Sequence, residues 1–469
     1  MDGGTAQEWC AQEFLDVDLG DARLNKRLVG IAAGLLEKPE TSLTRSVGSA
    51  SAVRAMGRFF DNHHFDHNDI MTPHFEQTLA RLEGHQTVLA IHDTTHLNFS
   101  SHRGTTGLGH VGTAHSVDCQ GIMMHSSLAI STGGECFGLL FEKLWTRPKH
   151  PKKTKLNAHQ TVPFSAKESF KWVEAVRSVD GLLGGLRKRP EIVWVSDRES
   201  DIYEYLAEVA ALGQQFLVRA NCNRVVDSPE RYVWETLLSA PVAGYRSLDV
   251  HELDGTVRRT KLEIRFCALP LRAQRRKGGA NVEKLPDIEI TGLLVREAEP
   301  PENGEPIEWC LLTNVKIDTL DKALEVIGWY EKRWHIECFH KALKSGMKAE
   351  DCRLDDVAKL KKFISLASIL ATRLYWAAHL SRQHPSSPCT AILNEIEWKV
   401  LYLKAKGQPP NSNHVPTLAE ATTWIAQLGG FRNTYKQPGM IVFWRGWQNL
   451  LALVEGFQLA RTLVNGGRD

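Results

Sequence analysis

The chain has 469 residues, of which 42% are hydrophobic and 24% are charged, values that exclude a disordered chain, a collagen and a coiled-coil rod. Its 57 basic and 55 acidic residues nearly cancel, so the net charge gives no sign of a polyanionic partner. The length suggests roughly three domains. Neither a signal peptide nor an apolar run of about 20 residues is visible, and the nine cysteines are scattered, so we expect a cytoplasmic location.

Basic side chains gather in three stretches along the chain. Residues 23–58 hold seven basic and two acidic side chains, residues 143–155 hold six basic and no acidic ones, and residues 258–277 hold eight basic and one acidic. Any one stretch could be an ordinary solvated face. Together they indicate surfaces that bind a polyanion.

The first 75 residues are predicted to form short helices. Apolar residues recur at helical spacing from Leu24 to Leu35, and Pro39 is expected to end that helix. A second helix is predicted over residues 49–61. These two helices carry five basic side chains that could contact phosphates, namely Arg23, Lys26, Arg27, Arg54 and Arg58.

Strands and helices alternate in the next part of the chain. The predicted order is strand 87–91, strand 123–130, strand 136–144, helix 165–186, strand 192–196, helix 200–212 and strand 215–220. Asp93 and Asp197 follow the ends of two of these strands. Open α/β sheets bind ligands at that end of their strands, so the pattern predicts an α/β fold with a site there.

The remainder is predicted to be a β-rich insertion, at about residues 225–315, followed by helices. One amphipathic helix is predicted over residues 319–348 and a more hydrophobic, buried one over 356–382. A Pro- and Ser-rich linker at 383–388 precedes a helical segment that begins near residue 390. We expect its apolar side chains to form a pairing surface, although they could instead pack on the rest of the chain; they are Trp424, Trp444, Trp447, Leu450, Leu451, Leu453 and Val454.

One face of the helix predicted over 319–348 carries polar functional groups. At 100° per residue its four members fall within about 60° of one another; they are Tyr330, Arg333, Glu337 and Lys344, and Lys341 and Trp334 flank them. A salt-bridged outer face is one interpretation. The other is a metal-binding carboxylate beside groups that hold phosphates.

Three carboxylates are therefore candidates for one site: Asp93, Asp197 and Glu337. A single Asp at a strand end is commonly a turn or cap residue. Three converging carboxylates repel one another unless cations lie between them, and oxygen ligands favour Mg²⁺ or Mn²⁺. Two such ions about 4 Å apart can activate a hydroxyl and stabilise the leaving oxygen of a phosphodiester.

These residues lie in segments that resemble the DDE transposases of the insertion-sequence-four family. The segments are IHDTTH with Asp93, VSDRESDIY with Asp197, and YEKRWHIECFHKALKSG, which shows the Y-x2-R-x3-E-x6-K signature from Tyr330 to Lys344. The spacings of 104 and 140 residues between the three acids agree with that family. GDARLNKRLV resembles its end-binding region, and LGGFRNTYKQPG and FWRGWQNL resemble its C-terminal region.

The resemblance implies an RNase H-like catalytic domain over residues 76–382, with a helical DNA-end-binding domain before it (1–75) and a helical dimerisation region after it (390–469). It further implies that two Mg²⁺ or Mn²⁺ ions bind at Asp93, Asp197 and Glu337. In the family the Tyr and Arg of the signature hold phosphate near a flipped base. Trp309 would stack on that base, and Arg219 would bind a second phosphate.

The expected function is cut-and-paste DNA transposition by a bacterial, nucleoid-associated homodimer. The protein would bind terminal inverted repeats, nick them, form and open a hairpin, and join the 3′ ends to target DNA. Two alternatives remain: an RNase H-like nuclease without strand transfer, and a transposase-derived DNA-binding regulator. A flipped-base pocket disfavours the first, and the presence of all three acids disfavours the second.

Overall fold

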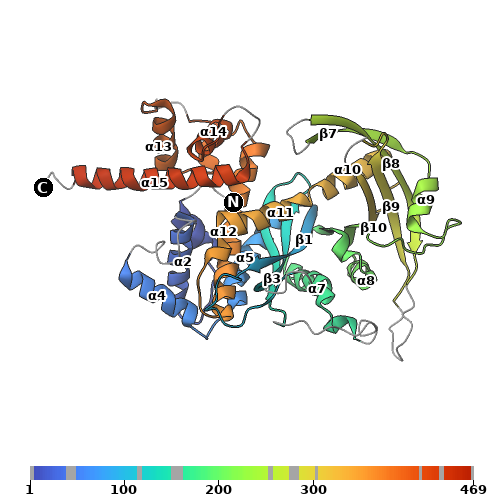
Figure 1. Ribbon diagram of the computed structural model, residues 1–469, viewed down its shortest axis with the longest axis horizontal. Helices are drawn as coiled ribbons and strands as arrows, with labels where there is room; N and C mark the ends of the chain where they lie inside the picture. Colours follow the sequence, from blue (N-terminus) through green and yellow to red (C-terminus); the bar gives the residue numbers. More distant parts are fainter. Residues whose placement is uncertain are drawn as a thin grey trace.

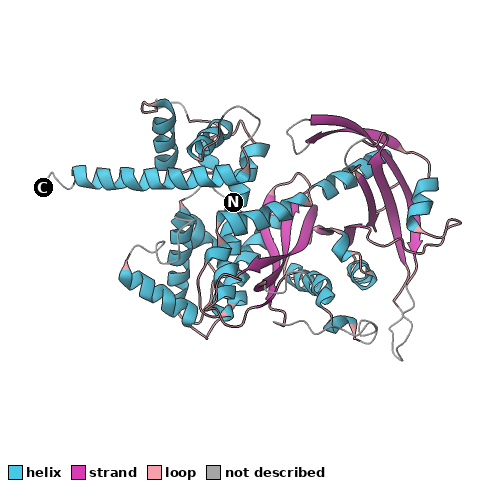
Figure 2. Cartoon of the chain, viewed as in Figure 1, coloured by secondary structure: helices cyan, strands magenta, loops and turns pink. Residues whose placement is uncertain are grey.

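A computed structural model describes residues 5–37, 49–112, 119–148, 162–251, 257–273, 285–301, 305–410, 415–432 and 438–465. Pro39 and parts of the basic stretches 143–155 and 258–277 lie outside these ranges. Within them the chain forms one large mixed sheet with helices on both faces (Figures 1 and 2). This mixed α/β architecture is consistent with an RNase H-like domain.

The sheet has ten strands, ordered β2-β3-β1-β5-β6-β10-β9-β8-β7, with β4 paired to β3. They are β1 (Thr87–Asn98), β2 (Gly109–His110), β3 (Gln120–Ser131), β4 (Cys136–Trp145), β5 (Glu191–Ser196), β6 (Gln215–Arg219), β7 (Gly244–His251), β8 (Val257–Leu271), β9 (Ile288–Glu297) and β10 (Glu308–Thr313). β1 pairs antiparallel with β3 and parallel with β5. The sheet therefore changes from antiparallel to parallel pairing at β1.

Helices cover both faces of this sheet. The α-helices are α1 (Ala6–Glu13), α2 (Ala22–Glu37), α4 (Ala50–Asp61), α5 (His67–Leu82), α7 (Lys171–Leu183), α8 (Tyr203–Ala211), α9 (Val233–Ser239), α10 (Leu320–Glu331), α11 (Trp334–Lys341), α12 (Val357–Gln383), α13 (Glu395–Lys406), α14 (Leu418–Leu428) and α15 (Met440–Asn465). α7, α8 and α9 pack on one face. The N-terminal helices, α10 to α12 and the C-terminal helices share the core on the other face.

α12 is the central helix of that second core. It is long and apolar enough to cross a membrane, but 83% of its most apolar stretch is buried inside the protein. Asp356 caps its first turn by accepting a hydrogen bond from the Ala358 amide at 2.7 Å. The prediction of a buried helix over 356–382 is confirmed.

The seven elements predicted between residues 87 and 220 occur in the predicted order, with Gly134 at φ +101° in the turn between β3 and β4, and the short strand β2 was not predicted. The prediction that the first strand ends at Ile91 is wrong: antiparallel pairing with β3 continues to Asn98. The strand-rich segment is not a separate sheet, because β10 pairs with β6 and extends the main one. It also contains α9, which the strand-like pattern concealed.

The N-terminal helices pack closely on the sheet domain. α5 runs through residue 75, where the boundary between domains was expected, and continues to Leu82. At the C-terminal end, α13 and α14 pack against the first half of α15, whose second half projects away from the molecule (Figure 1).

Candidate active site

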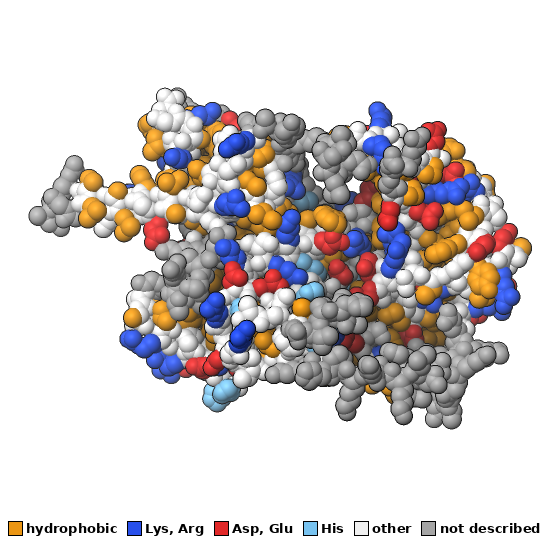
Figure 3. Space-filling view, viewed as in Figure 1, with side chains coloured by type: hydrophobic (Ala, Val, Ile, Leu, Met, Phe, Trp, Pro, Cys, Tyr) orange, Lys and Arg blue, Asp and Glu red, His pale blue; other side chains and the backbone are white. Residues whose placement is uncertain are grey.

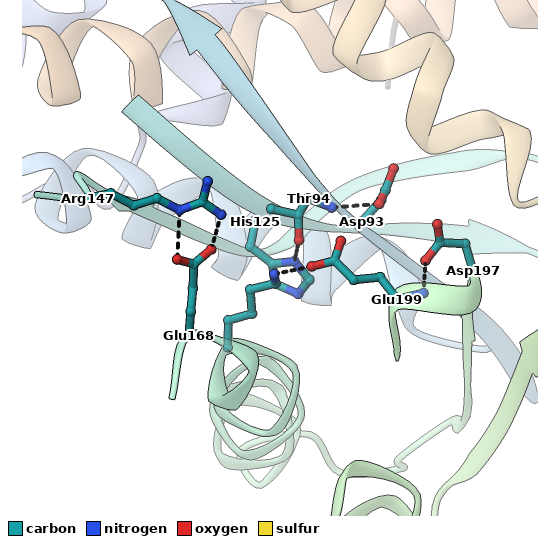
Figure 4. Close-up of polar contacts among 8 residues, drawn as sticks. Asp93, Thr94, His125, Arg147, Glu168, Asp197 and Glu199 are labelled. Carbon is teal, nitrogen blue, oxygen red and sulfur yellow. Dashed lines mark hydrogen bonds and ion pairs between the residues drawn. The ribbon is translucent and has the colours of Figure 1, made fainter. Parts of the chain in front are cut away.

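Asp93 on β1 lies beside Asp197, which directly follows the neighbouring strand β5. Parallel pairing of β1 with β5 ends with Ile91 opposite Val195, and each Asp follows two residues later. Since side chains alternate along a strand, both acids lie on the face where Ile91 and Val195 contact the core beneath α11. Figure 4 shows the two side chains next to each other at this point.

The electrostatics of Asp93 reflect this placement. Burial and, to a smaller extent, the negative charges of Asp197 and Glu199 together raise its pKa to about 7, while the Thr94 amide and the Arg333 charge oppose the rise. Thr94 donates its amide to Asp93 Oδ1 at 2.7 Å. A carboxylate that is this costly to ionise would be stabilised by a cation placed between the two Asp side chains.

Removing the charge of Asp93 should stabilise the metal-free protein. The folded-state pKa of about 7 lies above the ordinary value of 3.8, so the folded form holds a proton between these pH values and stability falls as pH rises through this window. Asp93→Asn should therefore raise the Tm at pH 8 and raise it clearly less at pH 5, where only the first part of this loss has occurred. Thermal unfolding in EDTA, with exposed Asp16→Asn as control, tests this; equal Tm values for the mutant and the wild type at pH 8 would contradict it.

The single helix predicted over residues 319–348 is wrong in detail. α10 ends at Glu331, α11 begins at Trp334, and a π-helical turn (Ala342–Gly346) follows. The Arg333 amide donates to the Tyr330 carbonyl, three residues earlier, at 2.9 Å, so the chain here is wound more tightly than an α-helix. The π turn is wound more loosely than an α-helix. The assumed 100° per residue therefore does not hold from Tyr330 to Lys344, although π turns are frequent at functional sites.

Arg333 connects Glu337 to the Asp pair. Its Nη2 donates to Glu337 Oε1 at 2.6 Å, and both side chains are partly buried. Its charge also lowers the pKa of Asp93. Among the described residues, no three His, Cys, Asp or Glu side chains lie close enough together to surround one metal ion. Arg333 therefore neutralises Glu337 here, and the predicted convergence of three carboxylates is seen only for the two Asp residues.

Tyr330 and Trp309 form the aromatic side of the site. Tyr330 is buried, and its ring meets that of Trp309 edge-on with centroids 5.6 Å apart. Burial raises the pKa of Tyr330, while the charges of Arg333 and Arg219 oppose the rise. Arg219, at the end of β6, donates to the Glu308 carbonyl at 2.8 Å. Two cations and two aromatic rings thus lie near Asp197.

Lys344 approaches the same acids from the π turn. Its Nζ donates to Thr95 Oγ1 at 2.8 Å, two residues beyond Asp93 on β1. Burial lowers the pKa of Lys344, and the charges of Glu350 and Asp93 oppose this. Lys341 is exposed on α11.

The five N-terminal basic residues lie on α2 and α4. Arg23, Lys26, Arg54 and Arg58 are exposed, Arg27 is partly buried, and Arg23 pairs with Asp21 at 3.0 Å. Lys and Arg side chains gather over α4 at the lower left of Figure 3. The helices α2 and α4 lie apart from β1 in the fold (Figure 1).

Sequence reasoning missed two neighbours of the Asp pair. The Glu199 amide donates to Asp197 Oδ1 at 2.8 Å (Figure 4). The Glu199 side chain accepts a hydrogen bond from the buried Lys171 at 2.5 Å. The Thr95 hydroxyl accepts the hydrogen bond from Lys344. Glu199 could have been noticed two residues after Asp197 in the DRESD segment, but nothing in the local pattern indicates Thr95.

Comparison with known families agrees with this arrangement. Residues 6–65 match the family model described as transposase DNA-binding, and residues 173–373 match the model described as transposase DDE domain. The chain is a DDE transposase. As an enzyme of this class it cleaves DNA and transfers strands, and DDE domains generally use divalent metals. All five N-terminal basic residues of the transposase lie in the first match, and Asp197 and Glu337 lie in the second.

Proposed function

We propose that this transposase moves its element by a cut-and-paste mechanism with a hairpin intermediate. It would act in the bacterial cytoplasm, associated with the nucleoid, as a member of the insertion-sequence-four family that resembles the Tn-five transposase. The observation that carries this proposal is the placement of Asp93 beside Asp197, next to the α10–α11 segment with its cations and aromatic rings.

The donor set fits divalent metal ions. Asp93 and Asp197 supply adjacent carboxylate oxygens. Burial and then the charge of Asp197 raise the pKa of Asp93, and a cation between the two side chains would offset both effects. Glu337 would be the third ligand once Arg333 turns to a DNA phosphate. When bound, two Mg²⁺ or Mn²⁺ ions would activate the attacking hydroxyl and stabilise the leaving oxygen.

The remaining residues of the site would hold the DNA strand. Arg333 and Tyr330 would bind a phosphate near the end of the element, with Lys344 and Lys341 beside them. Arg219 would bind a second phosphate, since its planar guanidinium suits that group. The exposed residues on α2 and α4 would contact the inverted repeat. Each contact positions the strand, and none depends on base sequence.

Trp309→Ala should slow hairpin formation more than the first nick. Hairpin closure bends the strand and forces a base out of the stack, and a stacked aromatic ring offsets about 1–3 kcal/mol of that cost. We therefore expect roughly a 10- to 100-fold slower hairpin step. A fluorescent base analogue at the element's end would report the flip, with Trp234→Ala, an exposed Trp on α9, as control. Equal slowing of both steps would mean that Trp309 serves only the core.

Pairing of two ends requires a homodimer, and the structure changes which residues could form it. Trp424, Trp444, Leu450 and Val454 are buried within one protomer, so this part of the expected surface is wrong. They fill the space between α13, α14 and the first half of α15. The exposed apolar side chains lie farther along α15, where Phe457 is 45% and Val464 64% exposed. A second copy of this half-helix is the proposed partner.

A strand-transfer assay tests the proposed function. A linear DNA bearing two copies of the element's end would be incubated with the full chain, Mg²⁺ and a supercoiled target plasmid. Joined products with hairpin intermediates are expected. Nicking without joining would indicate a nuclease, and end binding without nicking would indicate a regulator.

A further inference from the structure

A largely buried polar network joins α1 to the catalytic sheet, away from the site described above. Glu13, the last residue of α1, and His74 on α5 are both 0% exposed. His74 Nδ1 lies 2.5 Å from Glu13 Oε1, and the Leu139 amide donates to His74 Nε2 at 2.9 Å. Because an amide can only donate, the ring proton is on Nδ1 and points to Glu13. Burial also lowers the pKa of His74, so the ring is neutral.

Arg81 forms the second arm of this network. It contacts Glu13 Oε2, and its Nη1 donates to the Phe137 carbonyl at 2.9 Å. Burial alone would raise the pKa of Glu13, but the hydrogen bond from His74 and the charge of Arg81 outweigh it and lower that pKa. Glu13 is therefore an ionised carboxylate held by two side chains of α5, each of which also bonds the backbone of β4.

The backbone of β4 is shaped for this contact. Gly138, between the two bonded residues, has φ +135°. A Cβ atom there would lie 2.3 Å from Thr78 Oγ1 and 3.1 Å from His74 Cε1. Only glycine permits both this backbone conformation and this approach of α5. The network thus has a single tightly determined geometry.

A continuous row of paired residues connects the network to the site. Leu139 on β4 pairs with Leu128 on β3, and Leu128 pairs with Ile91 on β1. Ile91 is two residues from Asp93. At the other end, α1 lies in the matched DNA-binding region and also docks on α12, where Arg373 stacks on Trp9 at 4.9 Å.

We propose that Glu13, His74 and Arg81 are positioning residues that set the register between the bound DNA end and Asp93. This inference rests on the proposed function. Successive nucleotides along one strand of a duplex are about 3.4 Å apart, so a small shift of the DNA-binding region relative to β1 presents a different phosphodiester. A substitution in this network leaves a buried charge without its partner, which costs free energy. Movement of α1 away from α5 would expose that charge to water and relieve the cost.

The test maps where the full chain nicks DNA. The probe is a 5′-labelled duplex from DNA flanking the gene, shortened to the segment that the wild type protects from nuclease digestion. Glu13→Gln keeps the shape but removes the charge that faces Arg81, and Arg81→Lys keeps the charge but loses the bond to Phe137. The control is Asp16→Asn, which changes an exposed side chain.

With Mg²⁺, the wild type and Asp16→Asn should nick at one phosphodiester. Both network variants should bind equally well and nick at two or more positions about one nucleotide apart.

The inference would be overturned if both network variants nicked only at the wild-type position. This holds even if their binding and their nicking rate fell together, because lost stability alone produces such a fall. A wild type that binds but never nicks would contradict the proposed function instead. Hydrogen exchange on the free protein then decides the inference separately. In Glu13→Gln, the amides of α1 should exchange faster while those of β4 stay protected, and unchanged exchange in α1 would overturn it.

Discussion

Asp93→Asn, Asp197→Asn and Glu337→Gln should each reduce nicking by on the order of 10³-fold or more while leaving end binding intact. The reason is that each substitution would remove a charged oxygen of the proposed metal site without changing side-chain size. Asn is preferred to Ala at position 197, because the carboxylate also caps the turn Arg198–Ser200 by accepting the Glu199 amide. Cleavage and gel-shift assays in Mg²⁺, run in parallel on the same duplex, measure the two properties.

The matched control is Asp318→Ala, an exposed acid near the start of α10. Its cleavage should equal that of the wild type. Glu337→Gln is the most informative variant, since Glu337 is paired with Arg333 in this structure. If Glu337→Gln nicks like the wild type, Glu337 is only the partner of Arg333, and the ligand set would be reduced to the two Asp residues.

The two Asp residues were predictable because a strand followed by an acid is a local pattern. Apolar runs ending near Asp93 and Asp197 placed both at one edge of the sheet. The actual length of β1 depends on pairing with β3, which is a long-range property, and so its end was missed. The exact pairing of Ile91 with Val195, which sets the two acids side by side, was likewise not readable from either strand.

The helix that carries Glu337 shows the same limit. Its amphipathic pattern correctly indicated helix, but regular spacing cannot reveal the overwound turn at Arg333 or the π turn after Lys341. Buried polar networks are still harder to predict, because Glu13, His74 and Arg81 reveal their relation only when α1 packs on α5 and β4. Likewise, composition marked Trp444 as a pairing residue, whereas packing buries it.

Deleting residues 456–469 should abolish the two-end complex and leave binding of one end intact. Every side chain from Glu455 to Val464 is exposed, so this half-helix buries little apolar surface within its own protomer. Its apolar residues Leu453, Phe457, Ala460 and Val464 follow the 4-3-4 spacing of a coiled-coil seam. Burial of each large apolar side chain contributes about 1.5–3 kcal/mol, so pairing should weaken by more than about 10³-fold.

Light scattering on end-bound complexes would measure this loss as a change from two chains and two duplexes to one of each. Phe457→Glu should act like the deletion, because it places a charge in the seam, whereas Gln458→Glu adds the same charge to the adjacent exposed position and should not. The first half of α15 remains in all three proteins, and with it the buried Trp444 and Leu450 that hold the C-terminal helices together. A two-end complex formed by the deletion protein would therefore place the dimer contact on another surface of the transposase.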